Sequence, residues 1–305
     1  MIIRRPSNWL HMLFVWHGSV LPDIVPQLLL MLLTSTLALL TDGRILGAKI
    51  PLDTAAFPLV GVSMAIFLAF RNNASYQRFI EARQNWGQLL IASRALTSQA
   101  VNYLAGAPGF DRALLVRRLI AAIYALKHQL RGSDAMPELA QYLQPQELAE
   151  LQDSQFLPVA LLNRTRRMLT QAAMQLNGRS DVLMMLDRQL NSLASAVGAC
   201  ERIQHTPIPY AYGVLIHRTI YLYCLLLPFG LVDAIGVATP LITVFVSYTF
   251  FALEAIAQQI AEPFGTAPNC LALSAMARNI ERSLLELCGE SAPPALAVDR
   301  RYRVD

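Results

Sequence analysis

The sequence predicts an all-α integral membrane protein, with four membrane-spanning helices and a large helical region outside the membrane. The first observation is composition: 54% of the 305 residues are hydrophobic and only 15% are charged, whereas a soluble domain carries about a quarter charged residues. The mean hydropathy is +0.39. The second observation is that uncharged apolar stretches alternate with arginine-bearing segments. The third is that those segments show helical and not strand periodicity.

Four apolar spans define the predicted membrane part: 24–40, 55–70, 219–232 and 234–253. A spanning helix needs about 20 apolar residues, so we expect the first three spans to include flanking residues. Pro26 is tolerated near a helix start, whereas Pro228 and Pro240 should kink or bound their helices. Only Asp233 separates the last two spans, which predicts a tight hairpin. We therefore assign a first transmembrane pair to 24–70 and a second to 211–258.

The arginines predict the topology, because basic residues collect on the cytoplasmic side of a membrane. Both termini and segment 71–210 should be cytoplasmic, as these carry most of the basic residues that flank the spans: Arg4, Arg5, Arg71, Arg78, Arg83, Arg94, Arg202, Arg278, Arg282, Arg300, Arg301 and Arg303. Arg218, directly before the third span, agrees with this side. Loop 41–53, with Arg44 and Lys49, fits this rule less well. The net charge of +4 is explained by the same bias and does not indicate nucleic-acid binding.

Segment 71–210 reads as a cytosolic helical region. Leucine and isoleucine recur at helical spacing in Leu115, Leu119, Ile123, Leu126 and Leu130, and again in Leu183, Leu186, Leu190 and Leu193. Glycine and proline clusters at 106–109, 132–137 and 177–178 predict breaks between helices. With a cytosolic C-terminal helix and tail at 259–305, we read 1–305 as one domain with two zones.

The N-terminal stretch has its own pattern. Trp9, Met12, Leu13 and Trp16 share one helical face, at i, i+3, i+4 and i+7. Tryptophan near a membrane boundary is typical of a helix lying on the membrane surface. Burial of this face against the rest of the protein explains the pattern equally well.

Residues that carry chemistry are scarce. The four cysteines form no CxxC pair and the five histidines have no metal-ligand spacing. There is no phosphate-binding loop, nucleophile elbow or zinc-protease motif, so we expect no enzyme and no catalytic residue. His217, Arg218 and Glu254 lie at span ends, where they are better explained as anchors or an ion pair than as the proton relay of a transporter.

One stripe in the second span has two interpretations. Val62, Ile66 and Phe70 fall at i, i+4 and i+8, and the same face continues through Asn73, Gln77 and Glu81. Packing between helices in lipid is the simpler interpretation, and Gly61, Ser63, Ala65 and Ala69 supply the small residues that such packing favours. In the other interpretation, copies of this helix surround an axis. The apolar stripe is then a narrow pore that widens into a vestibule lined by Asn73, Gln77 and Glu81.

Four blocks of the sequence together resemble bacterial bestrophin homologues: "RRPSNWLHMLFVWHGSVLP", "FRNNASYQRFIEARQNWG", "ACERIQHTPIPYAYGVLIHRT" and "EPFGTAPNCLAL". The resemblance implies a homopentameric ion channel of the bacterial inner membrane, with lipid and permeating monovalent ions as its other partners. It implies a neck of three apolar rings, which fall on Val62, Ile66 and Phe70. A second, cytosolic constriction would lie in "SDVLMM", on Val182 or else on Leu183.

The sequence and the resemblance indicate ion selectivity and calcium dependence less directly. Bacterial relatives are associated with monovalent cations, and Glu81 on the stripe agrees with that, so we expect a Na⁺- or K⁺-conducting channel. A chloride channel of the same architecture is the alternative, and a secondary transporter a more remote one.

In animal members a run of acids after a Pro-Phe-Gly turn helps to bind Ca²⁺. Here Thr266 follows Gly265, and Glu262 alone is at hand, so we expect no cofactor and doubt a Ca²⁺ clasp.

Overall fold

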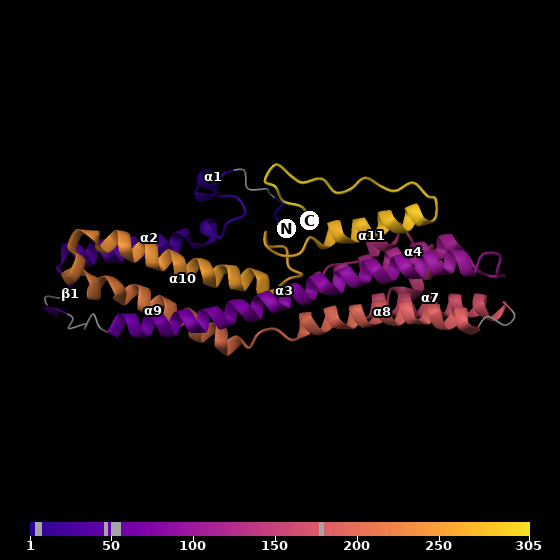
Figure 1. The fold of residues 1–305 in the computed structure, drawn as a ribbon, viewed down its shortest axis with the longest axis horizontal. Coiled ribbons are helices and arrows are strands. Elements are labelled where there is room, and N and C mark those ends of the chain that lie inside the picture. Colours follow the sequence, from indigo (N-terminus) through magenta and orange to yellow (C-terminus); the bar gives the residue numbers. More distant parts are fainter. Residues whose placement is uncertain (4–7, 46–47, 50–55, 177–179) are drawn as a thin grey trace. The chain divides into compact units, whose positions relative to one another are not determined.

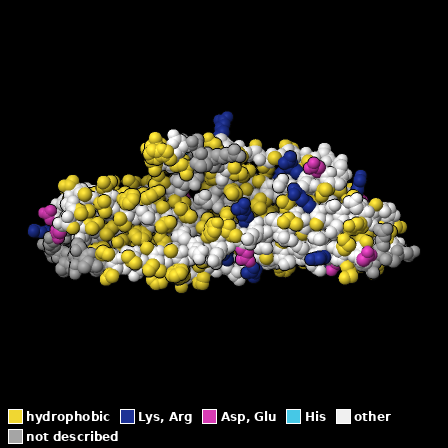
Figure 2. All heavy atoms as spheres, in the orientation of Figure 1, with side chains coloured by type: hydrophobic (Ala, Val, Ile, Leu, Met, Phe, Trp, Pro, Cys, Tyr) yellow, Lys and Arg dark blue, Asp and Glu magenta, His cyan; other side chains and the backbone are white. Residues whose placement is uncertain are grey.

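The computed structural model describes residues 1–3, 8–45, 48–49, 56–176 and 180–305, and these are almost entirely helical (Figure 1). The chain divides into two compact units. The first, here called the apolar unit, comprises Arg4–Phe79 and Pro207–Pro263; the second, the polar unit, comprises Met1–Ile3, Ile80–Thr206 and Phe264–Asp305. Hydrophobic side chains dominate the visible surface of the apolar unit, while charged side chains are scattered over the polar unit (Figure 2).

The apolar unit is built from long helices. It contains α1 (Trp9–Leu13), α2 (Leu21–Leu40), the first half of α3 (Ala56–Tyr103), α9 (Tyr210–Ile235) and α10 (Thr239–Ala261). Among the described residues, three stretches are long and apolar enough to cross a membrane: Leu21–Leu40, Phe57–Tyr103 and Tyr210–Ala261. The last of these comprises both α9 and α10. The start of the second predicted span, and the flanking Arg4 and Arg5, lie outside the described residues.

Helices α2, α9 and α10 pack side by side, and their inner faces form one apolar core (Figure 1). Met64 and Leu68 bring α3 into this core. Glycine allows α3 and α9 to approach closely: a Cβ on Gly230 would lie 2.2 Å from the ring of Phe57, and one on Gly61 would lie 2.9 Å from the hydroxyl of Tyr223. Gly61 therefore serves packing inside one chain.

The connections differ in detail from the prediction. Helix α9 continues past Asp233 to Ile235, and the reversal is made by the 3-10 turn η1 (Gly236–Ala238), with Gly236 at φ 52°. The expected hairpin is present, but its turn lies three residues later because Asp233 tolerates a helical conformation. Pro228 lies within α9, and Pro240 is the second residue of α10. After α2, a two-residue antiparallel pair joins β1 (Arg44–Ile45) to β2 (Ala48–Lys49), where we expected no strand.

The polar unit is a bundle around α4 (Arg112–Arg131). Helices α7 (Leu157–Met174) and α11 (Leu273–Leu287) pack on it, and α8 (Ser180–His205) packs on α7, while α5 (Met136–Leu139) and α6 (Pro145–Leu151) are short. The Asp111 carboxylate caps α4 by accepting from the backbone N–H groups of Ala113 and Leu114. Gly132 ends it in the left-handed conformation that glycine adopts without strain.

The predicted helical stripes of this unit are its core. Leu115, Leu119, Ile123, Leu126 and Leu130 are all buried, as are Leu186, Leu190 and Leu193. Helix α11 is fixed to the bundle by Glu281, whose buried carboxylate accepts hydrogen bonds from the hydroxyls of Tyr124 (2.8 Å) and Tyr142 (2.9 Å). Burial and these hydrogen bonds to the carboxylate raise the pKa of both tyrosines, which therefore stay neutral donors.

Candidate pore-lining face

The stripe predicted from the sequence lies on the outer face of α3. Val62, Ile66 and Phe70 are 61%, 51% and 64% exposed in the single chain. Met64 and Leu68, by contrast, are buried in the core of the apolar unit. Successive residues of an α-helix are turned by about 100°, so the stripe points about 180° away from these two side chains. The part of the chain that the structure describes therefore leaves three large apolar residues exposed in a line.

The same face becomes polar towards the end of the apolar unit. Asn73 and Gln77 are exposed. Farther along the same helix, in the polar unit, Glu81 is partly exposed and its carboxylate pairs with the guanidinium of Arg202 on α8. The change from apolar to polar side chains occurs within one continuous helix, α3. This arrangement suits a surface in contact with water, at least beyond Phe70.

Small residues flank the stripe. Ala65 and Ala69 are exposed, and the Ser63 hydroxyl donates to the Leu59 carbonyl at 2.9 Å, which satisfies it within the helix. A shallow apolar cavity of about 310 Å³ lies beside them, between α3 and α9. These features allow another helix or a lipid chain to approach α3 closely.

Charged groups at the ends of the spans form a single cluster. The buried carboxylate of Glu254 on α10 accepts from Arg71 Nη1 at 3.4 Å and lies 2.9 Å from His217 Nδ1. Nearby, Arg78 Nε donates to the carbonyl of Ala261 at 3.0 Å. The structure brings His217 and Glu254 within hydrogen-bonding distance, as an ion pair between them requires, and adds Arg71 as a partner that the sequence did not reveal.

The residues expected at the second constriction are less well placed. Val182 is only 6% exposed and points into the core of the polar unit, and Leu183 is half-buried. The next residue, Met184, is 74% exposed. Because side chains on a helix turn by about 100° per residue, Met184 and not Val182 lies opposite the core. The position of this segment in the sequence could not reveal which of its side chains faces outward.

Metal and thiol chemistry find little support in the part of the chain that the structure describes. No group of three or more His, Cys, Asp or Glu residues there could hold a metal ion. All four cysteines are buried, and none of them forms a disulfide. Burial raises the pKa of the Cys200 thiol to about 12, and burial also raises that of Cys288. These thiols are therefore unreactive near neutral pH.

The family model and the relatives that the chain resembles agree with each other. A family described as "Bacterial/Fungal Bestrophin protein" matches residues 1–286. The chain is 41% identical to the voltage-dependent anion channel-forming protein RSc3414 of Ralstonia nicotianae and 40% identical to the voltage-dependent anion channel-forming protein YneE of Escherichia coli. Both matches cover the whole of both chains.

Solved structures agree with the sequence comparison. The crystal structure of a bacterial bestrophin homologue from Klebsiella pneumoniae matches with a TM-score of 0.82 and 39% identity, over 88% of this chain and 99% of that one. These relatives are described as channels or membrane proteins and not as enzymes, as the sequence predicts. With its helical fold, its apolar unit and a family match over nearly its full length, the chain belongs to the bacterial and fungal bestrophin family.

Proposed function

We propose that several copies of this chain surround a central axis and form an ion channel, with Val62, Ile66 and Phe70 as its narrow apolar neck. The observation that carries the proposal is the exposed stripe itself, opposite the core and continuous with polar Asn73 and Gln77. In a ring of copies, each stripe residue is repeated as a ring of side chains. Apolar rings of this kind can gate by excluding water.

We propose five copies, as the family resemblance implies, with four crossings per chain. The crossings are α2, the first half of α3, α9 and α10. Helix α2 has 20 residues, so it is about 30 Å long, the thickness of a bilayer's hydrocarbon core. The polar unit and both termini would face the cytoplasm in the inner membrane, in agreement with the arginine distribution. The transmembrane pairs 24–70 and 211–258 and the cytosolic parts 71–210 and 259–305 follow from this arrangement.

We place the second constriction on Leu183, with Met184 beside it. The burial of Val182 argues against its side chain reaching the axis. Leu183 is half-buried and Met184 is exposed, so an oligomer could bring either to the axis without unfolding the local core.

The permeating ion is better proposed as an anion than as the cation expected from the sequence. Relatives 40% and 41% identical over their whole length are named anion channel-forming proteins. The argument for cations rested partly on Glu81, and the ion pair with Arg202 neutralises that carboxylate. Apolar rings carry no charge, so they favour neither sign.

Purified protein in planar bilayers tests the proposal. Under a tenfold KCl gradient, an anion-selective pore gives a reversal potential near that of Cl⁻, while a cation-selective pore gives the opposite sign. Linear current without saturation separates a channel from a carrier. Absence of any current in bilayers that contain correctly assembled protein would contradict the proposed function.

A further inference from the structure

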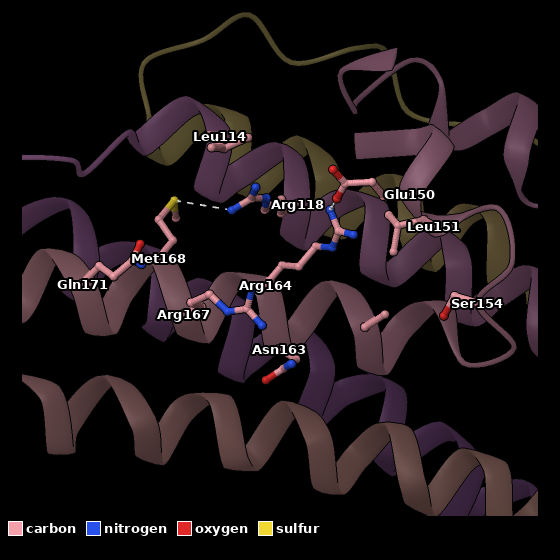
Figure 3. Close-up of a pocket in the computed structure, with 11 residues that line it drawn as sticks. Leu114, Arg118, Glu150, Leu151, Ser154, Asn163, Arg164, Arg167, Met168 and Gln171 are labelled. Atoms are coloured by element: carbon pink, nitrogen blue, oxygen red, sulfur yellow. Dashed lines mark hydrogen bonds and ion pairs between the residues drawn. The ribbon is translucent and has the colours of Figure 1, made fainter. Parts of the chain in front are cut away.

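A polar pocket in the polar unit is unrelated to the stripe on α3. It has a volume of about 530 Å³ and lies between α4, α6 and α7. Arg118 reaches it from α4, and Arg164 and Arg167 reach it from α7 (Figure 3). Three guanidinium groups around one space of this size are the arrangement that binds oxyanions, because each presents a fork of N–H donors.

The acidic residues nearby do not satisfy these arginines. Glu147 is buried, and its carboxylate accepts from Arg118 Nε at 2.7 Å, with Arg164 Nη1 farther away at 3.8 Å. Glu150 pairs with Arg164 at 2.9 Å, but its side chain is largely exposed. Arg167 makes no ion pair with any residue that the structure describes. Two carboxylates therefore face three guanidinium groups.

Arg118 has unused hydrogen-bonding capacity. A guanidinium carries five N–H donors. Besides its bond to Glu147, Arg118 directs Nη1 at the sulfur of Met168, 3.8 Å away, and a thioether is a weak acceptor. The Arg118 side chain is 16% exposed and lines the pocket, so a ligand in the pocket can reach its remaining donors. A bound oxyanion would supply stronger acceptors than the thioether of Met168.

The rest of the lining indicates the size and nature of the ligand. Leu114 and Met168 lie on one side of Arg118 and Leu151 on the other, so apolar groups lie at separate places in the lining (Figure 3), and Asn163 and Gln171 add neutral polar groups. The volume lies within the range of about 300–1,000 Å³ typical of small-molecule sites and far exceeds the needs of a lone inorganic anion. We propose that this pocket binds a soluble organic phosphate, with its phosphate on the three arginines and its organic part against the neighbouring apolar side chains.

Binding measured by calorimetry on the full-length protein in detergent tests the proposal, independently of any channel activity. AMP, inorganic phosphate and adenosine serve as probes. We expect AMP to bind more tightly than inorganic phosphate, and adenosine not to bind. Inorganic phosphate binding as tightly as AMP would overturn the organic part of the assignment, and adenosine binding as tightly as AMP would overturn the role of the phosphate.

Variants separate binding from folding. Arg167→Gln removes a guanidinium that holds no described structural partner, and AMP affinity should fall by about tenfold, the size of one charge-assisted contact. Arg117→Gln, an exposed change one residue from Arg118 and outside the pocket lining, should leave affinity within about twofold of wild type.

The Glu150→Gln variant should change AMP affinity in the opposite direction from Arg167→Gln. It removes the carboxylate that competes for Arg164, so AMP affinity should rise by a few-fold. A gain of affinity is not expected from a loss of structural support. Equal affinities of wild type and the Arg167→Gln variant, a weaker Glu150→Gln variant, or no binding of AMP at about 10 mM would overturn the proposal.

Discussion

Helices α2 and α3 carry the same geometric pattern with different chemistry around it. In α2, Leu29, Leu33 and Leu37 are 59%, 58% and 50% exposed, at i, i+4 and i+8. They point about 180° away from Met31 and Ser35, which are buried in the core. The stripe of Val62, Ile66 and Phe70 on α3 has the same spacing, similar exposure and the same relation to the core.

The difference lies in what surrounds each stripe. On α2 the neighbours Leu30, Leu32 and Leu40 are also exposed and apolar, and the helix ends at Leu40. On α3 Leu59, Val60 and Phe67 are exposed and apolar as well, but Ala65 and Ala69 beside the stripe are small, and the helix continues with exposed polar residues. A leucine surface that ends with its helix suits lipid, whereas a stripe that small residues flank and that turns polar suits a pore. The comparison teaches that exposure and spacing alone do not identify a pore-lining face.

The largest expected effect concerns the two faces of α3. Leu68→Ala truncates a buried side chain and should destabilise the apolar unit by about 2–5 kcal/mol. Leu68 lies off the stripe, but its burial makes it a core position and not a neutral control for the stripe. Ile66→Ala, two residues away on the exposed face, should be nearly neutral for the stability of the single chain. Thermal unfolding in detergent measures both, and equal losses would show that the stripe is also packed.

The next effect concerns conductance. Replacing Val62, Ile66 and Phe70 together by alanine should widen the neck, lower the dehydration cost and raise single-channel conductance by roughly twofold or more. The matched control is the triple alanine variant of Leu29, Leu33 and Leu37, which should conduct like wild type. Single-channel recording compares them. A stripe variant that assembles normally but conducts like wild type would show that the stripe on α3 does not form the neck. An equal change of conductance in both variants would show the same.

A smaller effect is expected at the polar end of the stripe. Because Arg202 pairs with Glu81, the Glu81→Gln variant leaves an unpaired guanidinium on this face and should shift the reversal potential under a KCl gradient towards that of Cl⁻. Gln77→Glu, which adds an unpaired carboxylate on the same face, is the comparison and should shift the reversal potential in the opposite direction, towards that of K⁺. Unchanged reversal potentials in both variants would show that this face does not line the path of the ions.

Much of this fold could be predicted because hydrophobic periodicity is a local property. The apolar spans, the leucine stripes of α4 and α8 and the stripe on α3 all follow from spacing along one helix. The side chain that faces outward at Val182–Met184 could not be predicted, since a shift of one residue turns a helix face by about 100°. The pocket of Arg118, Arg164 and Arg167 also escaped prediction, because it unites residues far apart in sequence on helices whose packing no local pattern reveals.

Water accessibility of the two stripes tests the central claim most directly. Ile66→Cys and Leu33→Cys place single thiols at equivalent positions of α3 and α2, and the four native cysteines are buried, so the background is low. A charged methanethiosulfonate reagent reacts only with thiols in contact with water. The account predicts that the reagent modifies Ile66→Cys and blocks its current, while Leu33→Cys is not modified and its current is unchanged. Modification of Leu33→Cys but not Ile66→Cys, or equal behaviour of the two, would contradict it.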